Sequence, residues 1–340
     1  MTPTASMTRG PVRAAARRGP WRRGRALAAL ALLLGLLMLL HAQVPNRGTG
    51  NLGSLTDTFL PWLGLFIPVL LAGALLRRSA AAVAALLLPA VVWLHLFGGT
   101  LSDKSHPGGF LTVASENVNA DNPDPAGTAR DLAASGADVL ALVELTPQAT
   151  GTYERELAKA YPYHTLAGTV GLWSKLPLSG TQPIDVTDYG PLADTREAGD
   201  DVLPGGRALR VTVATGHGPL TVYVAHLGSV RVNPAAGFWT ASRTIGVQAL
   251  SQAIAADPSK RLVLLGDLNG TMGDRAFAGL TAQLRSAQEV AGNGFGFTWP
   301  ASFPVLRIDQ ILVRGVAPDS SWVRPANGSD HRPVEARIGW

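Results

Sequence analysis

The sequence of 340 residues contains no cysteine. Disulfides, thiolate metal sites and cysteine nucleophiles are therefore excluded. A metal site in this chain must use oxygen or imidazole ligands. The lack of cysteine is compatible with a location outside the cytoplasm, but many cytosolic domains also manage without it, so it does not decide the compartment.

A general excess of positive charge is missing from most of the chain, although the whole sequence has a net charge of +5 and a pI near 9.9. Seven arginines lie between Arg9 and Arg25, whereas 18 Lys and Arg residues face 22 Asp and Glu residues from position 105 onward, which leaves about −4. This larger part lacks the cationic field that attracts long polyanions. We interpret the arginine-rich start as a solvated tail that orients a membrane helix, rather than as a nucleic-acid patch.

Charged residues are also absent from three apolar stretches, residues 26–44, 59–76 and 80–97. Each is about long enough to cross ~30 Å of hydrocarbon as a helix, so we predict three transmembrane helices. The stretches contain no Asp, Glu, Lys or Arg, and only Asp57 lies just before the second. This composition argues against a transporter or channel, which needs ionisable groups within the membrane.

The distribution of arginine predicts the orientation of these helices. Arg9 to Arg25 precede the first stretch, Arg77 and Arg78 separate the second from the third, and the intervening loop holds only Arg47. The positive-inside rule then places the N-terminus and the Arg77–Arg78 turn in the cytoplasm and everything after residue 98 outside. If residues 26–40 were instead the core of a cleaved signal peptide, the same part would still lie outside.

We therefore divide the chain into a basic cytoplasmic tail (1–25), a membrane segment (26–101), a linker (102–109) and an extracytoplasmic domain (110–340) of a multi-pass protein of the cytoplasmic membrane. Within the last part, helices are predicted over 127–135, 148–160 and 234–256, with Pro147 and Pro234 in first turns. Runs rich in Val, Leu and Ile predict strands and hence a mixed α/β domain; they are 110–115, 139–143, 170–174, 209–213, 220–225, 262–265, 308–313 and 334–338.

Polar residues follow the ends of these predicted strands. Strand ends meet at one edge of a sheet, so side chains distant in sequence can share one cleft. Each residue alone is more often a cap, a turn former or a structural histidine, and only the set predicts a site. The set comprises Asn117, Asn119, Glu144, His226, Asp267, Asn269, Asp309, Asp330 and His331.

Six short motifs occur in a fixed order: Ser-Glu-Asn-Val-Asn (115–119), Leu-Val-Glu (142–144), Ala-His-Leu (225–227), Gly-Asp-Leu-Asn (266–269), Arg-Ile-Asp (307–309) and Ser-Asp-His-Arg-Pro (329–333). This order resembles the endonuclease/exonuclease/phosphatase family, the deoxyribonuclease-I-like metallophosphoesterases. The resemblance implies a four-layer α-β-β-α sandwich with the active site at one end of the two central sheets. It also implies a hydrolase that acts on phosphoric ester bonds.

The resemblance assigns the metal to Glu144, Asn117 and Asp330. Mg²⁺ is the expected ion, because it binds one or two carboxylates and keeps waters and a phosphate oxygen, and Mn²⁺ or Ca²⁺ are alternatives. Asn119 is expected to assist phosphate binding from the same loop as Asn117.

The resemblance also assigns the catalytic residues. Asp267 matches the aspartate that orients or deprotonates the attacking water, and Asn269 matches a donor to a phosphoryl oxygen. His331 matches the catalytic histidine, and Asp309 matches the carboxylate that fixes its tautomer. His226 matches a second histidine that contacts phosphate and could protonate the leaving group.

The fold and the catalytic core do not select the substrate, because the family includes nucleases, sugar and inositol phosphatases, and phospholipases. The expected partners are the lipid bilayer and a phosphate ester, either nucleic acid or a lipid or inositol headgroup. The oligomeric state is open. The alternative function is a catalytically inactive, membrane-tethered binding module.

Overall fold

The computed structural model describes residues 21, 24–46, 50–187, 206–234 and 237–340. The chain forms two compact units, Met1–Leu39 with Trp62–Leu94, and Leu40–Pro61 with His95–Trp340. Most of the predicted basic tail, as well as Arg47, lies outside the described residues.

The first unit is built from apolar helices. Its elements are α1 (Arg25–Leu39), most of η2 (Leu60–Leu65), α3 (Phe66–Leu76), α4 (Ala80–Ala85) and most of α5 (Leu87–Phe97). Small residues are buried where α1, α3 and α4 pack together, among them Ala31, Gly35, Ala74 and Ala82. Small residues at helix contacts let backbones approach closely, as in membrane bundles.

Two helical runs in the described residues are long and apolar enough to cross a membrane, Leu52–Leu76 and Ala80–Leu101. The first predicted stretch, 26–44, is helical only over Arg25–Leu39 and continues into the 3₁₀ turn η1 (His41–Gln43). Three helices of membrane length were expected. The described residues contain two, and the helix in the first stretch is shorter. Pro45, which cannot continue a helix, follows this turn.

The second unit contains two mixed six-stranded sheets. The first has the order β13-β14-β1-β2-β4-β3, and its strands are β1 (Leu111–Asn117), β2 (Val139–Val143), β3 (Tyr163–Ala167), β4 (Val170–Ser174), β13 (Ala317–Val323) and β14 (Val334–Gly339). The second has the order β11-β12-β10-β7-β6-β5, and its strands are β5 (Leu178–Pro183), β6 (Ala208–Thr215), β7 (Gly218–Ala225), β10 (Leu262–Asp267), β11 (Arg285–Ser286) and β12 (Asp309–Arg314).

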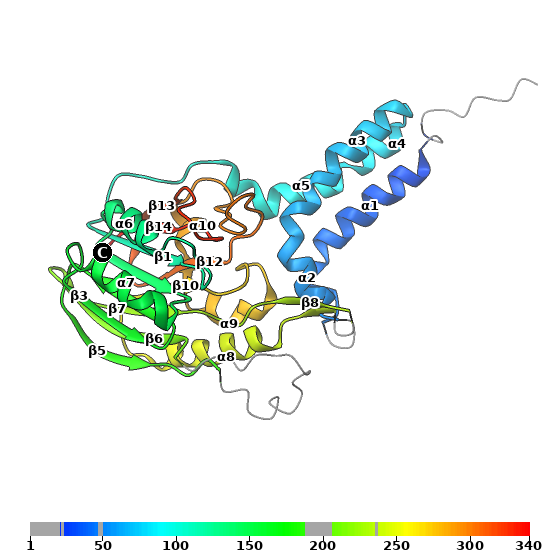
Figure 1. Ribbon diagram of the computed structural model, residues 1–340. Helices are drawn as coiled ribbons and strands as arrows, with labels where there is room; N and C mark the ends of the chain where they lie inside the picture. Colours follow the sequence, from blue (N-terminus) through cyan, green and yellow to red (C-terminus); the bar gives the residue numbers. More distant parts are fainter. Residues whose placement is uncertain (1–20, 22–23, 47–49, 188–205, 235–236) are drawn as a thin grey trace, which may run out of the picture. The chain divides into compact units, whose positions relative to one another are not determined.

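The two sheets pack face to face, and helices cover their outer faces (Figure 1). The central core interleaves Val113, Val139 and Leu172 of the first sheet with Val222 and Val263 of the second. Helices α6 (Pro125–Ser135) and α7 (Pro147–Leu157) cover the first sheet, while α8 (Ala241–Ala256) and α9 (Ala278–Thr281) cover the second. The predicted four-layer α-β-β-α sandwich is confirmed.

Local chemistry explains where the outer helices begin. The side chain of Asp124 accepts a hydrogen bond from the amide of Gly127 at the start of α6, and Thr146 does the same for Ala149 at the start of α7. Pro147 lies in the first turn of α7, as predicted. The predicted helix over 234–256 is wrong at its start, because Gly237–Trp239 forms β9, which pairs with β8 (Arg231–Asn233), and α8 begins only at Ala241.

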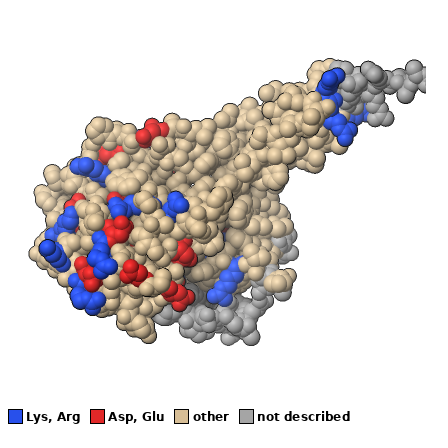
Figure 2. All heavy atoms as spheres, turned by 45° about the horizontal axis from the view of Figure 1, so that its top comes forward, with Lys and Arg blue, Asp and Glu red and all other residues tan. Residues whose placement is uncertain are grey.

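Two features of the second unit affect function. Residues 40–61, which the sequence analysis placed in the membrane segment, pack with this unit as η1 and α2 (Leu52–Phe59). In addition, the face of the sandwich shown in Figure 2 carries acidic and basic side chains side by side, without one continuous basic surface among its described residues. This mixture agrees with the small net negative charge of residues 105–340.

Candidate active site

Strand direction brings the predicted site residues to one edge of the sandwich. Strands β1 and β2 run parallel in the first sheet, and β7 and β10 run parallel in the second, so their carboxyl ends point the same way. Asn117 and Asp267 end β1 and β10, while Glu144 and His226 follow β2 and β7 directly. The antiparallel β12 starts at this edge, where Asp309 lies opposite Asp267 in register.

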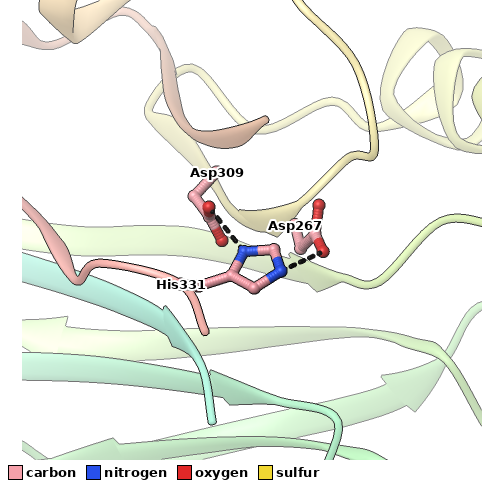
Figure 3. Close-up of side chains that lie close together, drawn as sticks. All are labelled: Asp267, Asp309 and His331. Carbon is pink, nitrogen blue, oxygen red and sulfur yellow. Dashed lines mark hydrogen bonds and ion pairs between the residues drawn. The ribbon is translucent and has the colours of Figure 1, made fainter. Parts of the chain in front are cut away.

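Three of these side chains form a compact group, and Figure 3 shows them on neighbouring segments. Nδ1 of His331 lies 2.9 Å from Oδ2 of Asp309, and Nε2 of His331 lies 3.8 Å from Oδ2 of Asp267. All three residues are at most 5% exposed. The Asp309 contact fixes the imidazole orientation and leaves Nε2 directed toward Asp267.

Electrostatics favours a protonated His331. Burial opposes its charged form, but the negative charges of Asp309 and Asp267 and the hydrogen bond to Asp309 outweigh burial and raise the His331 pKa to about 10. Burial raises the pKa of Asp267 to about 7, with His331 opposing and Asp309 reinforcing the shift. A carboxyl group with this pKa is suited to exchange a proton near neutral pH.

Hydrogen bonds orient the Asp267 carboxylate. The side-chain amide of Asn117 donates to Oδ2 at 3.0 Å, and the backbone amide of Asn269 donates to Oδ1 at 2.8 Å. The side-chain amide of Asn269 donates to the carbonyl of Leu227 at 2.9 Å, which ties the loop after β10 to the loop after β7. The carboxylate is therefore held in place before any substrate binds.

Glu144 lies beside this group in an unusual backbone conformation. Among the described residues, five non-glycine residues have positive φ, and three of them are predicted site residues: Asn119 at 60°, Glu144 at 68° and Asn269 at 52°. Asparagine tolerates this region, but glutamate does so at a cost of roughly 1–2 kcal/mol. Strained backbone of this kind concentrates at functional sites.

His226 differs from His331 in its protonation. It is 3% exposed, and its Nε2 lies 3.8 Å from Oδ2 of Asp267. Burial, Arg207 and His331 together lower its pKa well below the ordinary value of 6.5. His226 is thus a neutral imidazole at neutral pH, which can donate a hydrogen bond but does not carry a positive charge.

A pocket of about 380 Å³ opens at this edge. Of the predicted residues, Asn117, Glu144, His226, Asp267, Asn269, Asp330 and His331 line it. Asp309 lies behind His331 and does not line the pocket. Asn119 does not line it either, and its side-chain oxygen accepts from the amide of Asp121 within its own loop.

The residues around the pocket suit a divalent cation. Glu144, Asp330 and Asp267 bring three carboxyl groups to one pocket. Burial raises the pKa of Glu144, the hydrogen bond from Asn117 opposes the shift, and the charge of Asp330 reinforces it. A bound cation would offset this repulsion between carboxylates, and oxygen donors are the ligands Mg²⁺ prefers. Among the described residues, the ligand atoms of Asp267, Asp309 and His331 also lie close enough together to hold a metal ion, but Asp309 already accepts a hydrogen bond from Nδ1 of His331.

Some residues that support the site had no assigned role. Ser329 donates to the carbonyl of Asn117 at 2.6 Å and accepts from the amide of His331 at 3.1 Å, so it joins the segment before β14 to the end of β1. In the sequence, only the position of Ser329 inside the Ser-Asp-His motif indicates this supporting role. Arg243 donates to the carbonyl of Asn269 from α8, and no sequence motif marks it.

Comparisons with known proteins agree with this geometry. Residues 117–331 match the Endonuclease/Exonuclease/phosphatase family, which covers more than half of the chain. No curated protein was found to match this chain.

Several solved structures share the fold. TDP2 from D. rerio, complexed with single strand DNA product, has 20% identity and a TM-score of 0.53, covering 68% of this chain and 99% of that chain. A beta toxin mutant from Staphylococcus aureus with bound magnesium ions has 17% identity and a TM-score of 0.50, covering 67% and 99%. An endonuclease/exonuclease/phosphatase family protein from Leptotrichia buccalis has 14% identity and a TM-score of 0.51, covering 68% and 100%.

At these identities the structural likenesses concern the fold, and the family match carries the assignment. The predicted enzyme class is confirmed. The chain belongs to the endonuclease/exonuclease/phosphatase family and is a hydrolase that acts on phosphoric ester bonds.

Proposed function

We propose that this chain is a membrane-anchored, metal-dependent phosphoesterase whose catalytic unit lies outside the cytoplasmic membrane. The observation that carries the proposal is the buried pair of Asp309 and His331, which faces Asp267 across 3.8 Å at a pocket that Glu144 also lines. The reaction is the hydrolysis of a phosphodiester or phosphomonoester by in-line attack of water on phosphorus.

Glu144, Asn117 and Asp330 are the proposed metal-binding residues, and Mg²⁺ is the proposed ion, with Mn²⁺ or Ca²⁺ as alternatives. When bound, the ion supplies positive charge that polarises a phosphate oxygen and stabilises the leaving oxygen. Three carboxyl groups that line one pocket, together with the raised pKa of Glu144, support this assignment.

Asp267 is the proposed base that orients the attacking water. Its two oxygens are already fixed by Asn117 and the amide of Asn269, so the carboxylate needs little rearrangement when water binds. His331, protonated and held by Asp309, donates from Nε2 to a phosphoryl oxygen and stabilises the charge that develops there. The raised pKa of His331 supports this role.

His226 is proposed to contact the phosphate as a neutral donor. Its lowered pKa makes it a poor source of a proton for the leaving group, which favours phosphate contact over general acid catalysis. Asn269, whose side chain lines the pocket, is proposed as a further phosphate donor, and Asn119 is proposed to support the Asn117 loop through the bond from its amide to Oδ1 of Asn117.

The proposed location follows from the arginine distribution and the apolar helices. The helical runs Leu52–Leu76 and Ala80–Leu101 each contain an apolar stretch of membrane-span length, the predicted 59–76 and 80–97, and Arg77 and Arg78 lie between them. An arginine pair between two spans favours a cytoplasmic turn, and the chain after the second helix then lies on the outer side.

Nucleic acid and lipid or inositol headgroups are the candidate substrate classes. The TDP2 complex with single strand DNA product supports a nucleic-acid ester, whereas the mixed surface charge of this chain offers no broad attraction for long polyanions on the face described. Tethering to a bilayer would keep lipid headgroups at high local concentration.

The proposal is tested with the purified full-length chain in detergent, Mg²⁺ and bis-p-nitrophenyl phosphate. Asp267→Ala and His331→Ala should each lower kcat by at least about 100-fold, because each removes a group used in the transition state. His106→Ala and Asp185→Ala, in loops away from the pocket, serve as matched controls. Full activity in either site variant would contradict the assignment.

A further inference from the structure

Arg275 connects η1 and helix α2 to the rest of the catalytic unit. Arg275, at the start of the 3₁₀ turn η5 (Arg275–Phe277), donates from Nε to Oδ2 of Asp57 at 2.7 Å. The same guanidinium donates to the backbone carbonyls of His41 at 2.8 Å and Val44 at 2.6 Å. The side chain of Asp57 is 2% exposed and that of Arg275 is 28% exposed, so the carboxylate of this ion pair is shielded from water while the guanidinium is partly accessible.

A second connection runs from helix α2 to the catalytic loop. Ser54 donates to Oδ1 of Asp274 at 3.0 Å, and the other oxygen of Asp274 accepts from the buried Arg243. Arg243 in turn donates to the carbonyl of Asn269. Continuous hydrogen bonds therefore link α2 to a residue that lines the active-site pocket.

The other side of α2 lines the pocket itself. Leu55, Thr58 and Phe59 contribute to the wall, and they recur at the spacing of three and four residues that places side chains on one helical face. Ser54 and Asp57 instead contact Asp274 and Arg275, respectively. Thr58 is 5% exposed, and its hydroxyl oxygen has no hydrogen-bond partner among the described residues.

The lining of the pocket is therefore of two kinds. Asp267, His331 and Glu144 are among its polar residues, and many of the others are apolar, namely Val230, Val232, Phe238, Trp299, Leu306 and Ile308 together with Leu55 and Phe59. Phe59 and Trp299 are 39% and 36% exposed. Partly exposed apolar side chains around a polar site are stabilised when an apolar group of a ligand covers them.

The arginine that lines the pocket is already bound by other groups. Arg243 is the one Lys or Arg that lines the pocket among the described residues, and its guanidinium is bound to Asp274 and to the carbonyl of Asn269. Among the described residues, the apolar part of the lining thus offers no Lys or Arg side chain for a second phosphate group. A polyanion therefore gains little binding free energy from this part of the lining, whereas an apolar substituent gains it by burying apolar surface there.

We propose that helix α2 forms a specificity wall of the active-site pocket, that this wall selects phosphoesters with an apolar substituent beside the phosphate, and that the Arg275–Asp57 pair positions it. This inference rests on the proposed phosphoesterase function and adds the substrate class. Leu55 and Phe59 contact the substituent, and Arg275 acts as a positioning residue through α2.

The experiment uses the full-length chain in one detergent with Mg²⁺ and p-nitrophenyl phosphodiesters whose second ester group is methyl, butyl or hexyl. In the wild type, kcat/KM should rise at least about tenfold from the methyl to the hexyl ester, mainly through KM, as expected for methylene groups entering an apolar pocket. Leu55→Ala and Phe59→Ala should each lower the hexyl-to-methyl ratio at least threefold.

Arg275→Ala and Asp57→Asn should lower the same hexyl-to-methyl ratio by raising the KM of the hexyl ester. Arg275→Lys should restore part of this ratio. A general loss of folded protein would lower turnover of all esters alike and would not change the ratio. Leu52→Ala is the matched control, because Leu52 lies on the same helix, is 47% exposed and does not line the pocket. Leu52→Ala should keep the wild-type hexyl-to-methyl ratio. Partition of the esters into detergent affects every variant alike, so this control separates it from the effect of the pocket wall.

The two proposals fail differently. Turnover that is independent of ester length in the wild type, or a ratio unchanged in both Leu55→Ala and Phe59→Ala, would overturn the specificity wall and leave the phosphoesterase intact. Efficient cleavage of DNA or RNA together with such length-independent turnover would identify a nuclease instead. No metal-dependent turnover of any ester would overturn the proposed function, and this inference with it.

Discussion

At the scale of single residues, the backbone of Glu144 has φ of 68°, which an L-residue adopts at a cost. Glu144→Gly should therefore be more stable than Glu144→Ala, by about 1 kcal/mol in the free energy of unfolding, which reverses the usual order of these residues. The comparison is made by chemical denaturation, with Glu154→Gly and Glu154→Ala in helix α7 as controls that should show the usual order. An alanine variant as stable as the glycine variant would show that no strain is stored at Glu144.

The charge of His331 gives a pH prediction. Its pKa of about 10 in the folded chain lies above the ordinary value of 6.5, so its protonation stabilises the folded state at neutral pH, and this contribution is lost as the pH rises through about 10. In Asp309→Asn, the proton should be lost at a distinctly lower pH. Nitrogen chemical shifts of the imidazole in the metal-free chain measure this, with His331→Gln identifying the signal. An unchanged titration in Asp309→Asn would contradict the proposed role of Asp309.

The site residues could be predicted from sequence because each lies at or near an end of an apolar strand and occurs in an ordered motif. The structure brings most of them to one pocket, and it places Asn119 outside that pocket. The apolar wall could not be predicted, since Leu55, Phe59 and Trp299 belong to segments far apart in sequence and carry no motif. Apolar residues become part of a site only through the fold that assembles them.

At the scale of elements, the approach of β10 to β7 sets the position of Asp267. Gly266 has φ of 139°, and a Cβ atom there would lie 1.9 Å from the carbonyl oxygen of Ala225. Gly266→Ala should lower the free energy of unfolding by about 1–3 kcal/mol, because strand β10 must shift. It should also reduce hydrolysis at least tenfold, since Asp267 moves with the strand.

Gly216→Ala, in the turn between β6 and β7, is the matched control, because a Cβ atom there meets nothing within 4 Å. Denaturation and turnover are measured on both variants. If Gly266→Ala matched Gly216→Ala in both measurements, the close strand approach would have no part in positioning Asp267.

The place of a strand in its sheet decides whether the sequence predicts it. The eight predicted strands are the inner strands β1, β2, β4, β6, β7, β10, β12 and β14, whereas the four missed strands of the sandwich are its edges, β3, β5, β11 and β13. Inner strands are buried on both faces and read as apolar runs, but edge strands such as Leu178–Pro183 are mostly exposed and polar. The helix predicted from Pro234 failed for a related reason, because the short β8–β9 hairpin lacks an apolar pattern of its own.

At the scale of the whole molecule, the account predicts which side of the membrane each part faces. The chain has no cysteine, so single-cysteine variants report accessibility without background. Ser105→Cys should react with a membrane-impermeant maleimide added to intact cells, and Ser6→Cys should react only after the membrane is opened. The reverse pattern would contradict the proposed orientation. A shortened product that lacks the Ser6→Cys label even in opened membranes would indicate cleavage of the first apolar stretch.

The grouping of residues 40–61 with the sandwich also has a practical consequence. A fragment that begins at residue 105 would lose Asp57 and the backbone carbonyls that Arg275 binds, and would leave part of the pocket wall open. Function is therefore best measured on the full-length chain, where α2 can contribute to the pocket.

The central claim is that this chain is a metal-dependent phosphoesterase with Glu144 among its metal ligands. The most direct test is turnover of bis-p-nitrophenyl phosphate by the full-length chain after treatment with EDTA and again after addition of Mg²⁺, in the wild type and in Glu144→Gln. The account predicts that EDTA abolishes turnover, that Mg²⁺ restores it in the wild type, and that Glu144→Gln needs at least about tenfold more Mg²⁺. Turnover that persists in EDTA, or its absence with Mg²⁺, Mn²⁺ and Ca²⁺ alike, would contradict the claim.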